Sequence, residues 1–428
     1  MSVQHETDIA VVGAGAAGLF AAIWAGRTLQ DDPALRAGTP KTILALDGAK
    51  KLGAKILVAG GGRCNVTHHA VDEQQYAGSS RNAIKKVLRR FDVPETVAFF
   101  RELNVELKRE DTGKLFPTTD DAHTVLNALL DAARRASVTI RHPWRVARVR
   151  TDADSFLVEH EDGVASVRAR RVILATGGMA LPRSGSDGAG YEFARSLGHT
   201  VTPRVFPALV PLTLPKDHWI TALSGITLPA TLEVRSATNK RLKFFTNSTL
   251  LTHFGLSGPS VLDISRYFAD ARHEDAGARL VLNWLPGETI ESVDAALQKL
   301  GRTTPARWLR ERGLPERLAD AIVRSAGVDP STPGHALLRD NRRNLAQAIA
   351  ETPLPVSGDR GFTFAEVTAG GIPLGEIHLE TMESRICPGL HLCGEICDVD
   401  GRIGGFNFQW AWASGFVAGV GCARALAE

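Results

Sequence analysis

The chain has 428 residues, of which 44% are hydrophobic and 23% are charged, and its formal net charge is +3. These values are typical of a globular protein with two or three domains, because a single core stops growing at about 250–300 residues. The small net charge gives no indication of a nucleic-acid partner. Five cysteines without regular spacing argue against a disulfide framework and for a reducing compartment.

Two uncharged stretches, residues 9–26 and 403–423, reach the length of a membrane span. The first is interrupted by a glycine-rich turn, and the second contains Asn407, Gln409 and several glycines. Both fit buried segments of an α/β domain better. The N-terminus lacks the basic segment of a signal peptide. We therefore expect a cytoplasmic protein without a membrane partner.

The first predicted element is a buried strand over residues 8–12, followed by a glycine-rich turn and a helix over residues 19–27. Gly13, Gly15 and Gly18 form the pattern G-x-G-x-x-G. The order strand, turn and helix is typical of dinucleotide binding. The first glycine permits the tight turn, the second leaves room for a pyrophosphate, and the third lets the helix pack on the strand. The free N–H groups of the helix N-terminus would bind the phosphates.

The next predicted strand, residues 41–46, ends at Asp47, which we expect to hold the ribose hydroxyls of the dinucleotide. Asp47 follows Gly18 by 29 residues, whereas the usual spacing is about 20. Polar residues 31–40 are therefore predicted to form a lengthened loop. A carboxylate at this place favours FAD or NAD over NADP. The alternative is a solvated carboxylate at a strand end.

Three successive glycines, Gly60–Gly62, precede Arg63, Cys64 and Asn65. Such a run lets the backbone approach a ligand closely. We expect Arg63 to meet a phosphate and Asn65 to donate and accept hydrogen bonds near a ring edge. Cys64 either touches the cofactor or is inert, and we favour the inert interpretation. The alternative for the whole stretch is a flexible loop.

The rest of the chain alternates between an α/β pattern and a different middle part. Helices are predicted over residues 81–103 and 122–136, an extended turn over 114–118, and two or three strands over 138–160. A buried strand leads to Thr176 and Gly177, and a helix then ends near Gly198. From residue 200 onward prolines punctuate short β-rich runs, and four helices are predicted between residues 291 and 350. Strands return at 364–372 and 388–393, before Gly394 and Glu395.

The last helix is predicted to begin after Gly404 and Gly405, where its N-terminus would stabilise negative charge on a reduced flavin. We therefore predict one cofactor domain built from residues 1–190 and 365–428. A β-rich domain, residues 191–287 and 352–364, would be inserted into it. Residues 288–351 would form a helical subdomain within that insertion.

The chain resembles the BaiN-like NAD(P)/FAD-dependent oxidoreductases, a bacterial flavoprotein family. The resemblance rests on six blocks in order: residues 13–18, 60–67, 252–259, 368–372, 394–401 and 404–411. It implies an α/β fold with a Rossmann-type FAD-binding domain and an inserted β-barrel-like domain that carries a helical subdomain. One member type reduces carbon–carbon double bonds conjugated to a ketone in bile-acid intermediates. Arg402-Ile403 departs from the smaller or prolyl turn that relatives often have there.

The motifs and the resemblance together define the candidate residues. The expected cofactor-binding set is Gly13, Gly15, Ala16, Ala17, Gly18, Asp47, Lys55, Gly61, Gly62, Arg63, Cys64, Asn65, Thr176, Gly177, Gly394, Glu395, Gly404, Gly405, Phe406 and Asn407. His253 is the only histidine within the blocks that were singled out, and it is either a proton donor near the flavin or a buried core histidine. No metal site is expected.

The expected function is that of an FAD-dependent oxidoreductase acting on a small-molecule substrate, with reduction of a conjugated C=C bond as one reaction. Only one G-x-G-x-x-G follows a strand. NAD(P)H would therefore dock transiently as the electron donor, or another donor would reduce the flavin. The alternative is an FAD-binding protein with a non-redox or RNA-modifying role. The net charge and 6% aromatic content do not favour it, although the arginine-rich helices keep it open. The substrate, the donor and the oligomeric state are open at this point.

Overall fold

The computed structural model describes residues 5–36 and 39–427. The chain divides into two compact units, one of residues 1–207 and 366–428 and the other of residues 208–365. The insertion thus begins later than the predicted boundary near residue 190. The reason is that the segment after this boundary is tied to the first unit: His199 hydrogen-bonds to Glu376, and Gly371 donates to Thr202.

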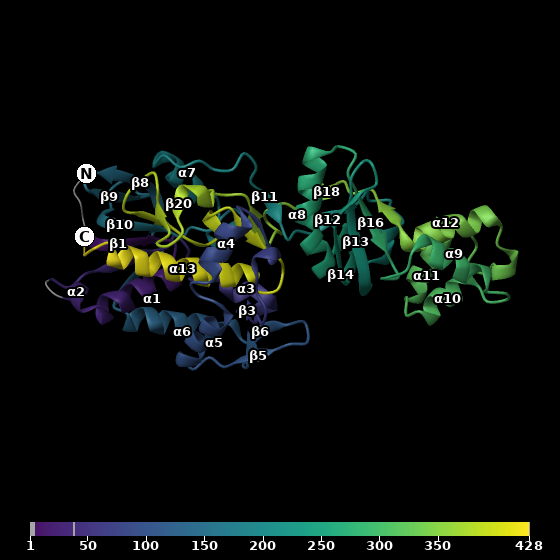
Figure 1. The fold of residues 1–428 in the computed structure, drawn as a ribbon, viewed down its shortest axis with the longest axis horizontal. Coiled ribbons are helices and arrows are strands. Elements are labelled where there is room, and N and C mark those ends of the chain that lie inside the picture. Colours follow the sequence, from purple (N-terminus) through teal and green to yellow (C-terminus); the bar gives the residue numbers. More distant parts are fainter. Residues whose placement is uncertain (1–4, 37–38, 428) are drawn as a thin grey trace. The chain divides into compact units, whose positions relative to one another are not determined.

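The first unit is built on a sheet of nine strands (Figure 1). Its centre is parallel, in the order β7 (Val138–Arg141), β2 (Ile43–Leu46), β1 (His5–Val12), β10 (Ser166–Leu174) and β22 (Leu390–Leu392). Antiparallel strands join it on the side of β22: β21 (Glu383–Ser384) and β20 (Ile377–His378) follow β22, while β9 (Ser155–His160), followed by β8 (Val146–Asp152), pairs with the first half of β10. Val12 lies opposite both Leu46 and Leu174, and Leu174 lies opposite Leu392. The carboxyl ends of four strands therefore coincide at one edge.

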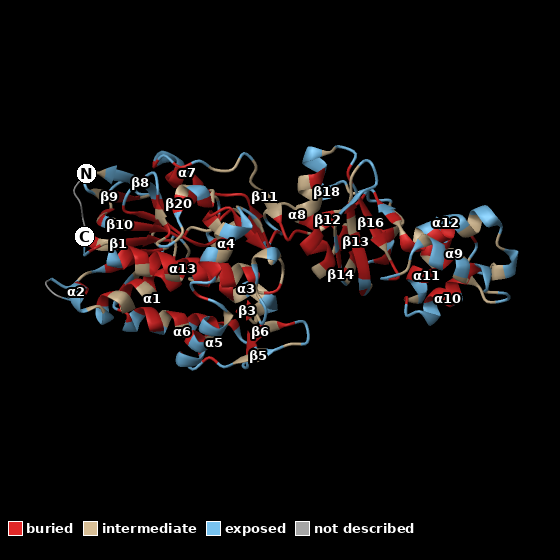
Figure 2. Ribbon diagram, viewed as in Figure 1, coloured by how far each residue is buried: buried red, intermediate tan, exposed pale blue. Residues whose placement is uncertain are grey.

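Two helices, α1 (Ala16–Asp31) and α13 (Phe406–Arg424), pack side by side in this unit (Figure 1). Gly415 faces Ala17 and Ala21, while Gly419 faces Ala21 and the next turn of α1. The two helices therefore run in the same direction. Most of their residues are buried (Figure 2), so both uncharged stretches belong to the core. In the part of the chain that the structure describes, no helix has the length and hydropathy to span a bilayer.

Shorter elements complete the first unit. The helices are α2 (Pro33–Arg36), α3 (Ala54–Gly62), α4 (Arg81–Leu88), α5 (Val93–Glu102), α6 (Ala122–Arg135) and α7 (Ala189–Ser196). The strands are β3 (Thr67–His68), β4 (Tyr76–Gly78), β5 (Leu107–Arg109), β6 (Lys114–Pro117), β19 (Val367–Ala369) and β23 (Val399–Gly401), with β11 (Phe206–Ala208) paired to β19.

Three local predictions in this unit differ from the structure. The helix predicted over residues 81–103 is two helices, because Asp92 and Glu95 form a capping box that starts α5. The loop predicted over residues 31–40 contains the end of α1 and the short helix α2. The turn predicted over residues 114–118 is strand β6, which pairs with β3 and β5.

The second unit contains a seven-stranded antiparallel sheet. Its strands are β12 (Leu212–Thr213), β13 (Thr227–Arg235), β14 (Arg241–Thr252), β15 (Gly255–Ser257), β16 (Arg279–Asn283), β17 (Thr352–Leu354) and β18 (Gly358–Asp359). They pair in the order β17-β16-β13-β14-β15-β12-β18, so the expected β-rich insertion is present, and its pairing is that of an open sheet rather than a closed barrel.

Five helices accompany this sheet: α8 (Pro259–Glu274), α9 (Ile290–Gln298), α10 (Pro305–Glu311), α11 (Glu316–Ser325) and α12 (Arg339–Ala350). The last four were predicted, whereas α8 was not. Strand and helix residues such as Leu232, Trp284, Leu318 and Ile349 belong to one apolar cluster. A separate helical subdomain remains a prediction.

Candidate functional site

The candidate residues of the first unit follow directly on neighbouring strand ends. Gly13 N donates to Leu46 O at 2.8 Å, Ala175 N donates to Val12 O at 2.9 Å, and Cys393 N donates to Leu174 O at 3.0 Å. The glycine-rich turn, Asp47, Thr176-Gly177 and Gly394-Glu395 therefore meet at the carboxyl edge of the parallel sheet. Open α/β sheets bind ligands outside this edge, at the point where the strand order reverses. Here that point lies between β1 and β10.

The glycine-rich turn has the geometry that the motif predicts. Gly13 adopts φ +98°, and a Cβ there would lie 2.5 Å from Ala175 O. Gly18 is equally restricted, since its Cβ would lie 1.8 Å from Gly13 O. Gly15 differs, because nothing lies within 4 Å of its Cβ position. It is the N-cap of α1, with neither a side-chain cap nor an acidic residue in the first turn. The N-terminus of α1 is thus open to an anion.

Asp47 stabilises this turn through both carboxylate oxygens. Its Oδ2 accepts a hydrogen bond from Ala14 N at 2.7 Å, and its Oδ1 accepts one from Ala49 N at 2.7 Å. The carboxylate is therefore fixed beside the turn at the strand end, and it is not a freely solvated group. Its binding of a ribose stays a prediction.

The three successive glycines interrupt α3. Ala59 is extended, and Gly60 and Gly61 have φ +60° and +71°. Nothing lies within 4 Å of a Cβ at Gly61. Asn65 follows, and its Oδ1 is buried without a hydrogen-bond partner among the described residues. An unsatisfied buried acceptor of this kind indicates a missing donor, and a ligand N–H group would satisfy it.

The Cys64 thiol is buried within the protein, and the Arg63 guanidinium is paired with other side chains of the protein. Burial raises the pKa of the Cys64 thiol to about 12, so it is a neutral thiol, which fits the inert interpretation. Arg63 Nη1 lies 2.6 Å from Glu110 Oε1 and 3.6 Å from Asp120 Oδ1, and its guanidinium stacks on Phe116 at 4.0 Å. Two carboxylates already balance the Arg63 charge, so a phosphate contact has no support in this arrangement.

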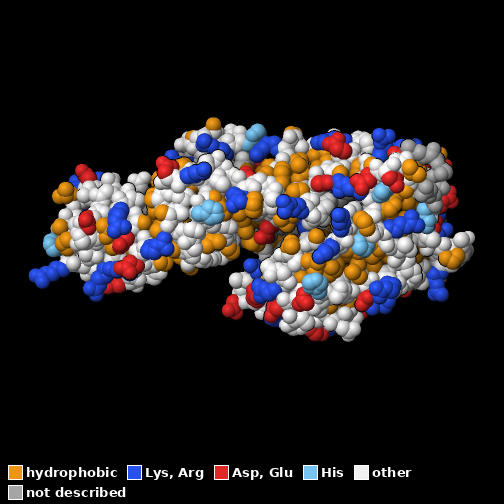
Figure 3. All heavy atoms as spheres, turned by 180° about the vertical axis from the view of Figure 1, so that it is seen from behind, with side chains coloured by type: hydrophobic (Ala, Val, Ile, Leu, Met, Phe, Trp, Pro, Cys, Tyr) orange, Lys and Arg blue, Asp and Glu red, His pale blue; other side chains and the backbone are white. Residues whose placement is uncertain are grey.

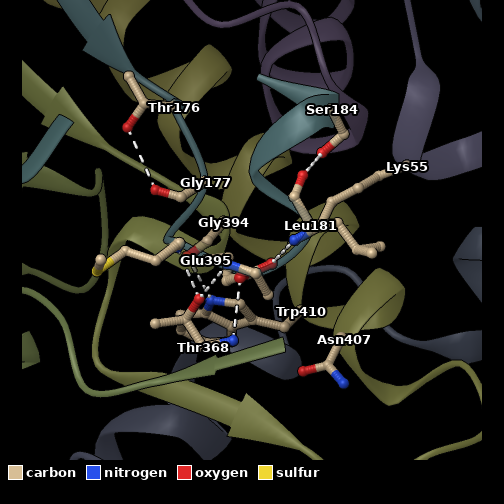
Figure 4. A network of polar contacts seen from close by, with 12 residues as sticks. Lys55, Thr176, Gly177, Leu181, Ser184, Thr368, Gly394, Glu395, Asn407 and Trp410 are labelled. Atoms are coloured by element: carbon tan, nitrogen blue, oxygen red, sulfur yellow. Dashed lines mark hydrogen bonds and ion pairs between the residues drawn. The ribbon is translucent and has the colours of Figure 1, made fainter. Parts of the chain in front are cut away.

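A polar network connects four segments of the site (Figure 4). Lys55 Nζ lies 2.6 Å from Glu395 Oε2, while Glu395 Oε1 accepts a hydrogen bond from Thr368 N at 3.1 Å. Thr368 Oγ1 in turn accepts from Met179 N and Ala180 N at 2.8 and 2.9 Å. The Glu395 side chain is only 18% exposed. It therefore points into the protein at the carboxyl edge, not into bulk solvent.

The N-terminus of α13 is the second uncapped helix end of the site. Its N-cap, Gly405, has no side-chain cap, and the first turn has no acidic residue. Gly415 is nine residues from the start of α13, whereas the residues that it faces, Ala17 and Ala21, are one and five residues from the start of α1. At a rise of about 1.5 Å per residue, the N-terminus of α13 therefore projects about 9 Å further than that of α1. Asn407 closes the preceding loop, because its amide exchanges hydrogen bonds with Gly401 N and O at 2.8 and 2.9 Å.

Gly405, one of the expected cofactor-binding residues, is constrained by the protein itself. It adopts φ +96°, and its Cβ would lie 2.5–2.7 Å from backbone atoms of Thr67. The glycine is required by packing within the protein. Gly404 has more space, with its nearest neighbour, Phe406, at 3.5 Å.

Two buried hydroxyl groups at the same edge were missed by sequence reasoning. Ser186 Oγ and Tyr191 OH have no hydrogen-bond partner among the described residues. A Cβ at Gly177 would lie 2.5 Å from Ser186 Oγ, and one at Gly178 would lie 3.0 Å from Tyr191 OH. Burial, together with Glu395, raises the pKa of Tyr191, which keeps its hydroxyl protonated. The run of small residues from Gly185 to Gly190 was the available signal.

His253 lies in the second unit, in the turn between β14 and β15. The residue is exposed, so the alternative of a buried core histidine is wrong. Its ring contacts Phe254 edge to face, with centroids 5.2 Å apart. The imidazole is therefore accessible to a small molecule.

The first unit fits an elongated dinucleotide such as FAD. It offers two uncapped helix N-termini on one side and open space at Gly15 and Gly61. The buried polar atoms of this unit that have no partner among the described residues include Asn65 Oδ1, Ser186 Oγ and Tyr191 OH. The residues that would hold the group are those of the glycine-rich turn, Asp47, Asn65, Glu395 and the start of α13.

Comparison with known proteins agrees with this geometry. The family model described as "HI0933-like protein Rossmann domain" matches residues 7–421. The chain is 35% identical to the 3-dehydro-bile acid delta(4,6)-reductase of Clostridium scindens over 98% of this chain and 99% of that protein. It is 31% identical to the ribosomal RNA dihydrouridine synthase of Escherichia coli over 99% of this chain and 98% of that protein.

Solved structures share the fold at low identity. A 3-ketosteroid delta1-dehydrogenase from Sterolibacterium denitrificans matches with a TM-score of 0.52 at 13% identity, covering 99% of this chain and all of that chain. The E. coli quinol fumarate reductase subunit FrdA matches with a TM-score of 0.51 at 15% identity, covering 99% and 71%. The predicted α/β class with a Rossmann-type FAD-binding domain is confirmed, and the matches support a flavin-dependent oxidoreductase.

Proposed function

Because the chain belongs to the HI0933-like Rossmann-domain family, as its resemblance to the BaiN-like oxidoreductases predicted, we propose that it is an FAD-dependent reductase of a C=C bond conjugated to a carbonyl. NAD(P)H is the proposed transient electron donor. The observation that carries the proposal is the convergence of the glycine-rich turn, Asp47 and the turn at Gly394 at one sheet edge, where Trp410 of α13 donates to Gly394 O at 3.0 Å.

The names of the two relatives share one chemistry. One protein is named a bile-acid reductase and the other a dihydrouridine synthase. Dihydrouridine is uridine with hydrogen added across the C5=C6 bond, which is conjugated to a carbonyl group. Both names are therefore compatible with addition of a hydride and a proton to an activated double bond.

In this proposal the chain binds and orients the cofactor, and FAD supplies hydride transfer when bound. Asp47 holds the ribose end, and the start of α1 binds the pyrophosphate. Asn65 accepts a hydrogen bond from the ring system, and the N-terminus of α13 favours negative charge near it by about 0.3–1 kcal/mol. Glu395, held by Lys55 and Thr368, fixes the turn after β22.

We propose His253 as the proton donor. Hydride addition to the β carbon leaves a carbanion-like α carbon, which needs one proton. An exposed imidazole can supply that proton as a general acid. His253 makes no hydrogen bond to the described part of the chain, and its ring packs against Phe254, so its nitrogens are free to meet a substrate.

A small molecule is the favoured substrate, and a uracil base within RNA is the second candidate. In Figure 3, basic and acidic side chains are interspersed over the face shown, without a continuous basic track. The observation favouring RNA is the charge distribution. Residues 208–365 contain 19 Lys and Arg against 16 Asp and Glu, and the rest of the chain contains 31 of each. The whole formal excess of +3 thus lies in the second unit.

Stopped-flow measurements under anaerobic conditions test the proposal. The purified protein is first mixed with NADH or NADPH, and the reduced protein is then mixed with a steroid enone or with unmodified ribosomal RNA. We expect flavin bleaching by a nicotinamide donor and reoxidation by one acceptor class. His253→Gln should slow the reoxidation and leave the reduction by NAD(P)H unchanged. Absence of flavin, or no reoxidation by either acceptor, would refute the proposal.

A further inference from the structure

Arg360 in the second unit is clamped between two aromatic rings. Its guanidinium carbon lies 4.3 Å from the centroid of Phe254 and 3.8 Å from the centroid of Phe364. Phe364 is 48% exposed, so this side of the cluster is accessible from solvent. Packing against two rings restricts the guanidinium, and stacking on aromatic faces leaves the N–H donors at the edge of the planar group available.

The Arg360 guanidinium has no hydrogen-bond acceptor and no carboxylate partner among the residues that the structure describes. Two other stacked arginines, Arg27 and Arg63, differ in this respect. Arg27, which lies 5.1 Å from both Trp24 and Phe99, is paired through two hydrogen bonds with Glu102. Arg63 on Phe116 is paired with Glu110. Arg360 thus combines an ordered planar cation with unused donors.

The surroundings of Arg360 belong to one sheet. Strand β12 pairs with β15, which follows Phe254, and with β18, which precedes Arg360. The backbone N–H of Arg360 donates to Pro211 O at 3.1 Å, so the start of the side chain is fixed as well. In the same β14–β15 hairpin, Thr252 Oγ1 is buried without a partner among the described residues. His253 packs on the Phe254 ring that also carries Arg360.

A fixed guanidinium with free donors is suited to a planar or tetrahedral oxyanion, because two parallel N–H groups match two oxygens of a carboxylate or phosphate. Building on the proposed function, we propose that Arg360, clamped by Phe254 and Phe364, binds an anionic oxygen group of the substrate beside His253. The substrate is therefore an unsaturated carbonyl compound that also carries a carboxylate or a phosphate.

Binding measurements on the FAD-loaded protein test this inference with two matched pairs of probes. Cholate is compared with the uncharged steroid 4-androstene-3,17-dione, and uridine 5′-monophosphate is compared with uridine. The wild type should bind one anionic probe more tightly than its neutral partner. Arg360→Gln should lower the affinity for that anionic probe about tenfold or more and leave the affinity for the neutral probe unchanged, as expected for loss of a charge-assisted hydrogen bond. Arg360→Lys should recover only part of the loss, because lysine keeps the charge without the fork.

Arg312→Gln is the matched control. Arg312 also stacks on an aromatic ring, Trp308 at 3.9 Å, but only on one side, and it is exposed. Its substitution should change neither pair of affinities. The cholate and uridine 5′-monophosphate measurements show whether the bound oxyanion is a carboxylate or a phosphate. Equal affinities of the wild type for the charged and neutral probes, or equal losses in Arg360→Gln and Arg312→Gln, would overturn the inference. Failure of the proposed reduction would appear separately, as anion binding through Arg360 without substrate reduction.

Discussion

A substitution of Asp47 tests the prediction that this carboxylate holds the ribose of a bound dinucleotide. Its two oxygens accept hydrogen bonds from Ala14 and Ala49, and each carboxylate oxygen has capacity for a further donor. Asp47→Asn should lower the affinity for FAD by about 1–3 kcal/mol, the cost of losing a hydrogen bond to a charged group. Titration of the apoprotein with FAD measures the change. An unchanged affinity would mean that Asp47 serves the turn alone.

We expect His391 on β22 to make the free energy of unfolding depend on pH. Both ring nitrogens are buried without a partner among the described residues. Burial, with a smaller contribution from Arg171, lowers its pKa from 6.5 to about 4. Between about pH 6.5 and pH 4 the unfolded chain therefore binds a proton that the folded chain does not. The free energy of unfolding falls as the pH falls through this range.

His391→Leu should remove this contribution, which amounts to about 2 kcal/mol between pH 7 and pH 5. Urea unfolding at the two pH values measures it. His378→Leu, at an exposed position on β20 of the same sheet, is the control, and its pH dependence should match the wild type. A His391→Leu variant with the wild-type pH dependence would show that the folded protein protonates His391 readily.

At the scale of elements, the Lys55–Glu395 pair connects α3 with the turn after β22. The side chains are 26% and 18% exposed, and the two atoms are 2.6 Å apart. A double-mutant cycle with Lys55→Met and Glu395→Gln should give a coupling energy of about 1–2 kcal/mol in denaturant unfolding of the apoprotein. The exposed pair Arg134–Asp131, with 78% and 54% exposure, should give less than about 0.5 kcal/mol. Equal couplings would contradict a structural role for Lys55–Glu395.

Elements that follow local rules could be predicted from the sequence, and long-range contacts could not. The strand–turn–helix at Gly13 and the start of α13 after Gly405 follow from patterns within a few residues. The pairing of Arg63 with Glu110, the contact of Gly405 with Thr67 and the unpartnered Tyr191 hydroxyl depend on residues from distant parts of the chain. Helix α8 was missed because it follows directly on β15 in a region read as β-rich.

At the scale of the whole molecule, segments from both ends of the chain build one site within the first unit. Strands β1, β2, β10 and β22 bring residues near 13, 47, 176 and 394 to one edge. Helices α1 and α13 run in parallel, so their open N-termini face the same side. The second unit carries His253 and Arg360. Cofactor binding and substrate recognition can therefore be tested by separate variants.

The central claim is that FAD, when bound, fills the open space at Gly15. Gly15 has φ −78° and no atom within 4 Å of its Cβ position, and threonine is about as good an N-cap as glycine. Gly15→Thr should therefore leave the unfolding midpoint of the apoprotein unchanged while removing FAD binding, because the side chain fills the pyrophosphate space. Gly375→Thr is the control, since Gly375 also has no neighbour within 4 Å. The measurement is FAD titration of the three apoproteins. Loss of FAD binding in Gly15→Thr alone is the predicted result, and wild-type FAD affinity in that variant would contradict the account.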